Sequence, residues 1–357
     1  MSGLEWPRPN PQSITTISPT LANTLLACEK RAAFELDPST AKISRPNTRT
    51  ALGSAAHALI EAVLRGEAPP AGARTEWLEE KWDDALDHEA QKLAAAWHDR
   101  TVPPTERWPG LVATRRRLIK RLDRLAAAST AAMKPRPRAP DEGIAPLPWI
   151  ERWMEDPKTG LAGKADLVEE AEGQVRVVDH KTGVHQGEIR ETQRRQLLIY
   201  AHLASVNLGR PVDEAVILDT KGNESSFTIE PAAVKAAVCE VAAARDRFES
   251  VRKTASFKAS PSPESCRFCP FRIICLDYWR ALDTHEAQDE WPVSDICGSA
   301  TQAAENVVTV ASGNREVQLV LADGVTLGSA SEIAAVDLDR IGEYGARMRW
   351  NSLIRVG

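Results

Sequence analysis

The segment VRVVDHKTG, residues 175–183, places an aspartate and a lysine two positions apart at the end of an apolar run. Side chains two positions apart on a β-strand point to the same face of the sheet, so Asp179 and Lys181 would project together. The same acid-x-lysine pattern also occurs at residues 79–81, 156–158 and 219–221. The neighbouring sequence must therefore decide which of these pairs carries chemistry.

The three other pairs stand in less suitable surroundings. Residues 79 and 81 lie within an expected helix, where side chains two positions apart diverge. Pro157 places the second pair in a hairpin turn. The third pair is followed at once by a turn, and no acid-bearing strand directly precedes it. These three pairs are interpreted as structural, which leaves Asp179 and Lys181 as the candidate.

The alternation of polar and apolar residues predicts three consecutive strands that lead to this pair. They cover residues 149–156, 161–170 and 175–180, joined by the turns PKTG and AEG. The short second turn makes the last two strands antiparallel neighbours, so Asp166 would meet Asp179. Two carboxylates beside a lysine suit a divalent cation and an attacking water in phosphodiester cleavage.

Two expected helices bring further groups to the same point. A helix over residues 52–66 carries His57 as a further ligand or orienting group, with Glu61 one turn later. A helix over about 188–208 follows the last of these strands and places Gln196 and Tyr200 one turn apart. The same helix adds positive charge near the expected phosphate through Arg194 and Arg195.

Residues 73–98 and 107–132 are helical by periodicity, and the second of these helices has two distinct faces. One face is apolar and the other is basic. The basic face consists of Arg117, Lys120, Arg121 and Arg124. It would be either a solvated surface or a surface that contacts nucleic-acid phosphates.

The composition is that of an ordinary globular protein. With 357 residues, of which 43% are hydrophobic, the chain can build one large domain with an accessory module. A net charge of -5 excludes a protein that is coated in basic surface, so any nucleic-acid site would be a local patch. No apolar run reaches the roughly 18 residues of a membrane span, and residues 1–20 lack a signal pattern, so we expect a cytoplasmic protein.

These motifs together resemble the PD-(D/E)xK nuclease superfamily, in particular its RecB-like branch, which includes the AddB nuclease domain and the CRISPR-associated RecB-like exonucleases. The resemblance rests on His57 in GSAAH, Asp166 in GKADLV, residues 179–181 in VVDHKTG, and the pair Gln196 and Tyr200 in Q-x-x-x-Y. One departure is Ala165, which stands where the superfamily's name has proline.

The resemblance implies a role for each of these residues. His57, Asp166, Asp179 and the backbone carbonyl of His180 would bind Mg²⁺ or Mn²⁺. Lys181 would orient or activate the water. Gln196 and Tyr200 would position the nucleic-acid backbone near the scissile phosphate.

The cysteines form a second pattern. Cys266, Cys269 and Cys275 have the spacing C-x₂-C-x₅-C, and thiolates at such spacing bind either Zn²⁺ or an iron-sulfur cluster. Cys28 lies far upstream, in the second half of a helix expected to start with the cap Ser18 and Pro19. The resemblance implies a [4Fe-4S] cluster on these four cysteines. The remaining two, Cys239 and Cys297, are interpreted as packing or surface residues.

The chain from about residue 305 onward is rich in short strands and turns and lies outside the resemblance. It could form an OB-like barrel, a fold that holds single nucleic-acid strands in other proteins. Its contacts would then be Arg347, Arg349 and Trp350. The alternative is a module that stabilises the protein or docks a partner.

The sequence as a whole predicts an α/β protein with a restriction-endonuclease-like core, in which helices flank a mixed sheet. The core would span residues 14–290, with a helical insertion at about 70–132, an iron-sulfur clasp, and a β module, OB-like or not, at 295–357. The expected function is metal-dependent cleavage of DNA, as an exonuclease on single strands or ends, in repair, recombination or defence. The alternative is a silent or partner-dependent DNA-binding subunit. A helicase partner would have to supply any motor, because the chain lacks the phosphate loop G-x-x-x-x-G-K-[ST].

Overall fold

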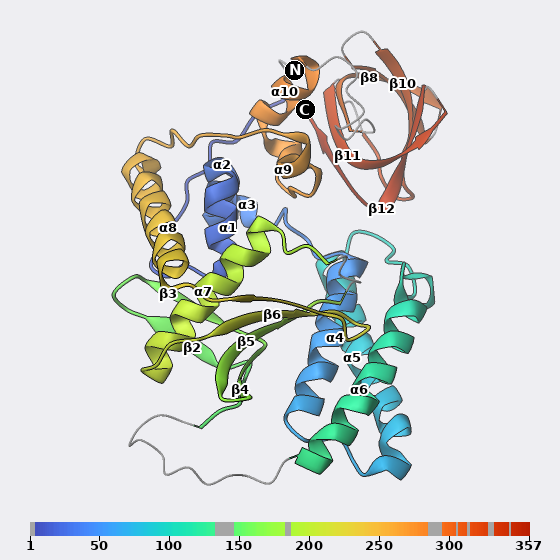
Figure 1. Cartoon of the computed structure of the whole chain (residues 1–357). Coiled ribbons are helices and arrows are strands. Elements are labelled where there is room, and N and C mark those ends of the chain that lie inside the picture. Colours follow the sequence, from blue (N-terminus) through green and yellow to red (C-terminus); the bar gives the residue numbers. More distant parts are fainter. Residues whose placement is uncertain are drawn as a thin grey trace.

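The computed structural model describes residues 4–132, 146–182, 187–284, 295–304, 306–312, 315–327, 332–342 and 344–357. These residues form a mixed α/β body, a helical extension beside it, and a β-barrel that follows the last helix (Figure 1). The expected mixed sheet flanked by helices is confirmed. Within the described part of the chain, no helix is both long and apolar enough to cross a membrane.

The central sheet has five strands in the order β1-β4-β5-β6-β7. Its strands are β1 (Trp149–Ile150), β4 (Leu167–Ala171), β5 (Gln174–His180), β6 (Glu214–Leu218) and β7 (Glu224–Thr228). All neighbours are antiparallel except β5 and β6, which run parallel because helix α7 (Glu191–Leu208) connects them. A separate hairpin pairs β2 (Trp153–Asp156) with β3 (Leu161–Lys164).

The predicted three-strand meander is wrong in one respect, because two of its strands are each broken in two. The chain bends at Glu151, which has a positive φ of 47°, so β1 joins the central sheet while β2 leaves it. It bends again at residues 165–166, between β3 and β4. The predicted antiparallel pairing of the acid-bearing segments is confirmed, since β4 pairs with β5 and Leu167 lies opposite Val178.

The two faces of the central sheet pack against different helices. On one face, Val175 and Val177 pack in a large core with the helices α1 (Pro19–Ala27), α7 and α8 (Pro231–Arg252). On the other face, Val178 packs in a small cluster that includes Leu64 at the end of α4 (Thr48–Leu64). Asp179 and Lys181 therefore leave β5 on the side of α7, because they share the face of Val175 and Val177.

The N-terminal region confirms the predicted cap but not the predicted single helix. Ser18 accepts a hydrogen bond from the Leu21 amide and Pro19 is the first residue of α1. The helix ends at Ala27, Cys28 is extended with a φ of −162°, and α2 (Glu29–Leu36) begins directly after it. A short helix α3 (Pro38–Ala41) leads towards α4.

The helical extension consists of α4, α5 (Ala71–Ala96), the turn η1 (Thr105–Arg107) and α6 (Leu111–Ala132). The two predicted helices of this region are confirmed, with bounds that differ by a few residues. Trp82 and Leu118 are fully buried between these helices, which form an apolar core of their own. Most of the Pro-rich segment predicted for residues 133–148 lies outside the described residues.

The last segment of the body carries the cysteine trio on short elements. These are α9 (Pro263–Arg267), η2 (Arg272–Ile274) and α10 (Leu276–Thr284). The buried Arg272 guanidinium bonds the Cys269 carbonyl at 3.2 Å, Asp295 Oδ2 at 2.6 Å and Asp337 Oδ1 at 2.7 Å. Because Asp295 and Asp337 belong to the C-terminal module, this one side chain joins that module to the cysteine segment.

The C-terminal module is a closed barrel with the strand order β10-β12-β11-β8-β9. The strands are β8 (Ile296–Ala304), β9 (Val307–Ser312), β10 (Arg315–Val320), β11 (Glu332–Ile341) and β12 (Gly345–Val356). Trp350 of β12 packs edge-on against Trp97 at the end of α5, with ring centroids 5.4 Å apart. The barrel therefore contacts both the cysteine segment and the helical extension.

Candidate active site

The site lies where β4 begins and β5 ends. The pairing of Leu167 with Val178 puts Asp166 level with Asp179 on the neighbouring strand. Asp166 Oδ2 accepts a hydrogen bond from the His180 amide at 2.6 Å, which fixes the carboxylate across the two strands. Burial, together with the charge of Asp179, raises the pKa of Asp166 to about 7.

His57 reaches the two acids from α4. A capping box formed by Asn47 and Thr50 starts this helix. His57 Nδ1 lies 3.6 Å from Asp166 Oδ1, and burial lowers the pKa of the imidazole. A neutral imidazole beside a carboxylate is a donor set that Mg²⁺ and Mn²⁺ can use.

Lys181 lies at the open edge of the site. Its Nζ is 2.7 Å from Asp179 Oδ2, and a third of its side chain is exposed, whereas Asp179 is buried. The predicted projection of both side chains from one strand is confirmed. The ammonium group can therefore face a phosphate or a water that enters from solvent.

Gln196 and Tyr200 lie on α7 over the same strand ends. Their side chains are hydrogen-bonded to each other, and burial raises the pKa of Tyr200 to about 12, helped by the neighbouring acids. Gly163 of β3 permits this approach, since a Cβ there would lie 3.3 Å from Tyr200 Cε1 and 3.0 Å from Pro19 Cδ. Tyr200 thus remains a protonated hydrogen-bond donor at neutral pH.

The sequence reasoning missed Glu151. One carboxylate oxygen of Glu151, one of Asp166 and a ring nitrogen of His57 all lie within 4.8 Å of one another. Burial raises the pKa of Glu151, as do the charges of Asp166 and Glu61. The only indication in the sequence is that Glu151 follows the apolar pair 149–150. Strand alternation does not predict the bend that turns the Glu151 side chain towards the site.

The other predicted acid of α4 and the competing motifs have structural partners. Glu61 forms an ion pair with Arg65 at 2.5 Å. Asp156 accepts hydrogen bonds within its turn and lies 2.8 Å from His202 Nε2, and Asp219 holds the turn before β7. The interpretation of Asp156 and Asp219 as structural acids is confirmed.

A model of the PD-(D/E)XK nuclease superfamily matches residues 16–276. The chain belongs to the PD-(D/E)XK nuclease superfamily. The matched range includes every residue of the site described above, from His57 to Tyr200, and ends just after Cys275. No curated protein matches the chain significantly.

The predicted DNA-contacting residues of this superfamily member divide into exposed and inward-facing groups. Arg117, Lys120 and Arg124 are exposed on α6. Arg121, on the same helix, is turned inward: it bonds the Asp219 carbonyl at 3.0 Å and His180 Nδ1 at 2.7 Å. Arg121 therefore belongs to the interior contacts of the nuclease and not to its exposed basic face, which corrects the prediction for this residue.

The two arginines of α7 are also engaged within the protein. The guanidinium of Arg194 lies over the Phe227 ring, 4.2 Å from its centroid. Arg195 bonds Asn23 and Glu240 at 3.1 and 3.2 Å, so its charge is already compensated. Of these two, Arg194 is better placed to meet a phosphate.

The side chain of His180 faces the interior, while the prediction for this residue concerns its backbone carbonyl. It is buried, and burial together with Arg121 and His57 lowers its pKa to about 3. Because an arginine can only donate, Nδ1 accepts and the proton of the neutral ring sits on Nε2. His185 lies outside the described residues.

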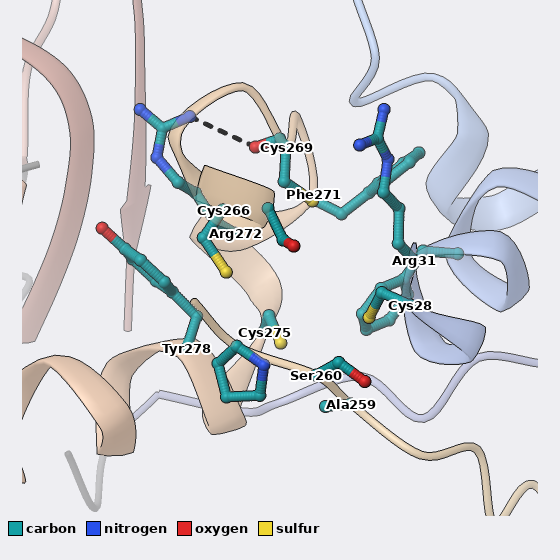
Figure 2. Close-up of a pocket in the computed structure, with 13 residues that line it drawn as sticks. Cys28, Arg31, Ala259, Ser260, Cys266, Cys269, Phe271, Arg272, Cys275 and Tyr278 are labelled. Carbon is teal, nitrogen blue, oxygen red and sulfur yellow. Dashed lines mark hydrogen bonds between the residues drawn. The ribbon is translucent and has the colours of Figure 1, made fainter. Parts of the chain in front are cut away.

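The four predicted cluster cysteines line one pocket of the nuclease (Figure 2). Cys28 comes from the break between α1 and α2, and the other three come from the segment of α9, η2 and α10. The pocket contains about 380 Å³ of empty space, part of it open to solvent. Burial raises the pKa of Cys269 and of Cys275 to about 11, so free thiols would stay protonated here.

The raised pKa of Asp166 predicts that metal binding depends on pH. A cation must displace the proton that this carboxyl holds below about pH 7. We expect the affinity for Mn²⁺ to rise with pH, by up to about tenfold per unit below pH 7, and to level off above it. Calorimetry in buffers of different ionisation enthalpy measures both the affinity and the released proton. An affinity that stays flat from pH 6 to pH 8 would contradict this assignment.

Proposed function

We propose that this nuclease is a divalent-metal-dependent deoxyribonuclease that acts as an exonuclease on single-stranded DNA or DNA ends. The observation that carries the proposal is a set of three relations at the end of β5: His57 lies 3.6 Å from Asp166, Asp166 stands level with Asp179, and Lys181 lies 2.7 Å from Asp179. The donors are one imidazole nitrogen and carboxylate oxygens, which fit Mg²⁺ or Mn²⁺.

Each side chain has a task in this proposal. His57, Asp166, Asp179 and the His180 carbonyl would hold the cation, which supplies Lewis-acid chemistry at the scissile phosphate. Lys181 orients the attacking water and offsets the negative charge that develops on the phosphate. Tyr200, kept protonated, and its partner Gln196 donate hydrogen bonds to the DNA backbone.

The exposed side of α6 supports a path for DNA to the site. Arg117, Lys120 and Arg124 are exposed there, and Arg121 anchors the same helix to the end of the catalytic strand. Phosphates bound along this face would therefore lie on the helix that contacts His180, the neighbour of Lys181 in the chain. A surface of this kind is charged enough to position a strand without reading its sequence.

The cysteine pocket supports a [4Fe-4S] cluster held by Cys28, Cys266, Cys269 and Cys275. A single Zn²⁺ with four thiolates brings the sulfur atoms to about 3.8 Å from each other. Among the residues that the structure describes, no three of these sulfur atoms lie within 4.8 Å of one another. The wider spacing of the sulfur atoms favours a larger group. Its role would be structural, tying the N-terminal helices to the end of the nuclease region.

The strand order of the barrel supports an OB-like fold, whereas its side-chain contacts support a stabilising role within the protein. In chain order its strands pair 1-2-3-5-4-1, with the third and fifth parallel, and this five-stranded closed order supports an OB-like barrel. Two of its expected contact residues are engaged elsewhere, however: Trp350 packs on Trp97 and Arg349 pairs with Asp339 at 2.6 Å. We therefore propose that the barrel braces the helical extension against the cysteine segment.

The main alternative is a silent or partner-dependent DNA-binding subunit of a larger helicase-nuclease or defence complex. The complete set of acids and lysine argues against a silent site, because buried carboxylates this close destabilise a fold that does not use them. A soluble cytoplasmic protein in DNA repair, recombination or defence fits the proposed activity.

The proposal is tested with end-labelled linear single strands, linear duplexes and closed circular single strands, each incubated with Mn²⁺. We expect the linear single strand to be degraded from an end while the circle resists. Cleavage of the circle at the same rate would replace the exonuclease with an endonuclease. Binding of all three substrates without cleavage would favour the silent subunit.

A further inference from the structure

We propose that Glu151 is a third carboxylate ligand of the nuclease metal site. This assignment rests on the metal-dependent function proposed above and adds to the set of His57, Asp166 and Asp179. Nothing in the motifs of the chain points to Glu151, which lies at the bend between β1 and β2. It would take a hard divalent cation, Mg²⁺ or Mn²⁺.

The geometry favours Glu151 as a ligand. Its carboxylate oxygen lies within 4.8 Å of a ring nitrogen of His57 and of an oxygen of Asp166, the one such group of three among the described residues. The three side chains come from α4, from the bend between β1 and β2, and from the bend between β3 and β4. One nitrogen and two oxygens that approach from three directions leave a common point between them, as a coordinated cation needs.

The backbone holds Glu151 in this position. Its φ of 47° is uncommon for a residue other than glycine, and its amide donates to the Asp166 carbonyl at 3.2 Å. The bond ties the bend at Glu151 to the bend at Asp166, so the two carboxylates are presented together. Their side chains are also hydrogen-bonded to each other, and two carboxylates in contact need a shared proton or a cation between them.

Glu151 also differs from the acids around it. Glu61 is paired with Arg65, and Asp179 is paired with Lys181. Glu151 forms its contacts with the other proposed donors, Asp166 and His57. A cation at this point would therefore meet Glu151 without breaking one of these ion pairs.

The test is Mn²⁺ binding to the full chain by calorimetry, which needs no DNA and no activity. We expect Glu151→Gln, which keeps the size of the side chain, to weaken Mn²⁺ binding at least about tenfold. Glu155→Gln is the matched control, because Glu155 is exposed on β2 and lies outside the site. Its affinity should stay within about twofold of the parent protein.

Thermal unfolding separates ligation from folding. Without metal, Glu151→Gln should melt at or above the temperature of the parent chain, since one of two adjoining acids is gone. Added Mn²⁺ should raise that temperature less than it does in the parent. If Glu151→Gln does not fold, Glu151→Asp serves instead, with the same expected loss of affinity.

Unchanged Mn²⁺ affinity in these variants would overturn the role of Glu151. The variant Asp166→Asn tells the two proposals apart. If it also binds Mn²⁺ normally, the metal site of the proposed function is wrong. If it loses binding while Glu151→Gln retains it, the proposed function stands and Glu151 is no ligand.

Discussion

Replacing Lys181 with alanine is expected to reduce Mn²⁺-dependent DNA cleavage by about 10²–10³-fold, because the site would lose the charge proposed to face the scissile phosphate. Asp179→Ala should reduce activity to at least the same extent, because it removes a proposed metal ligand and leaves the Lys181 ammonium group without its ion-pair partner. The measurement is the initial rate of release from a labelled single strand. Binding of the DNA should change much less than the rate.

Lys158→Ala is the matched control for this prediction. Residues 156–158 have the same acid-x-lysine pattern as residues 179–181. However, Lys158 is exposed, and Asp156 is hydrogen-bonded within its own turn and to His202. The rate of Lys158→Ala should stay within about twofold of the parent enzyme. Equal rates in the parent, Lys181→Ala and Asp179→Ala would show that the chemistry lies elsewhere.

Replacing Cys266 with serine is expected to abolish iron binding and to destabilise the nuclease by on the order of 5 kcal/mol. This loss of stability has the size expected for a crosslink that closes a very long loop, here the proposed cluster between residues 28 and 266. The anaerobically purified parent chain should be brown, absorb near roughly 400 nm and carry about four iron atoms. The variant should be colourless and unfold at lower denaturant concentration.

Cys239→Ser is the control for the cluster. Cys239 is an exposed free cysteine on α8, outside the pocket, so this variant should keep both colour and stability. A colourless parent with one tightly bound zinc would refute the iron-sulfur proposal. The same comparison by iron content avoids any dependence on nuclease activity.

The sequence was sufficient for the acids and the lysine because strand alternation controls their direction. Asp166, Asp179 and Lys181 lie on one face of neighbouring strands. The short turn between β4 and β5 forces these two strands to pair with each other in an antiparallel arrangement. Alternation could not reveal the bends at residues 151 and 165–166, and the positive φ of Glu151 has no signature in the sequence. Glu151 was missed for that reason.

Helical periodicity had a similar limit. It identified the basic face of α6, but Arg121 turns inward to His180 and Asp219 because the helix packs against a strand that is distant in sequence. Likewise the trio Cys266, Cys269 and Cys275 has a local spacing, whereas its meeting with Cys28 is decided only by the packing of the whole chain. Tertiary contacts of this kind are invisible to any local pattern.

The long span of the cysteine pocket also constrains how the chain is made. A ribosome delivers Cys28 early, but Cys275 must leave the exit tunnel before the four thiols can meet. The helices α1 and α2, which flank Cys28, therefore wait until Cys275 has been synthesised before they meet this partner. Loading of the proposed cluster would then be a late check on folding, because it would require Cys28 and the cysteine trio to have come together.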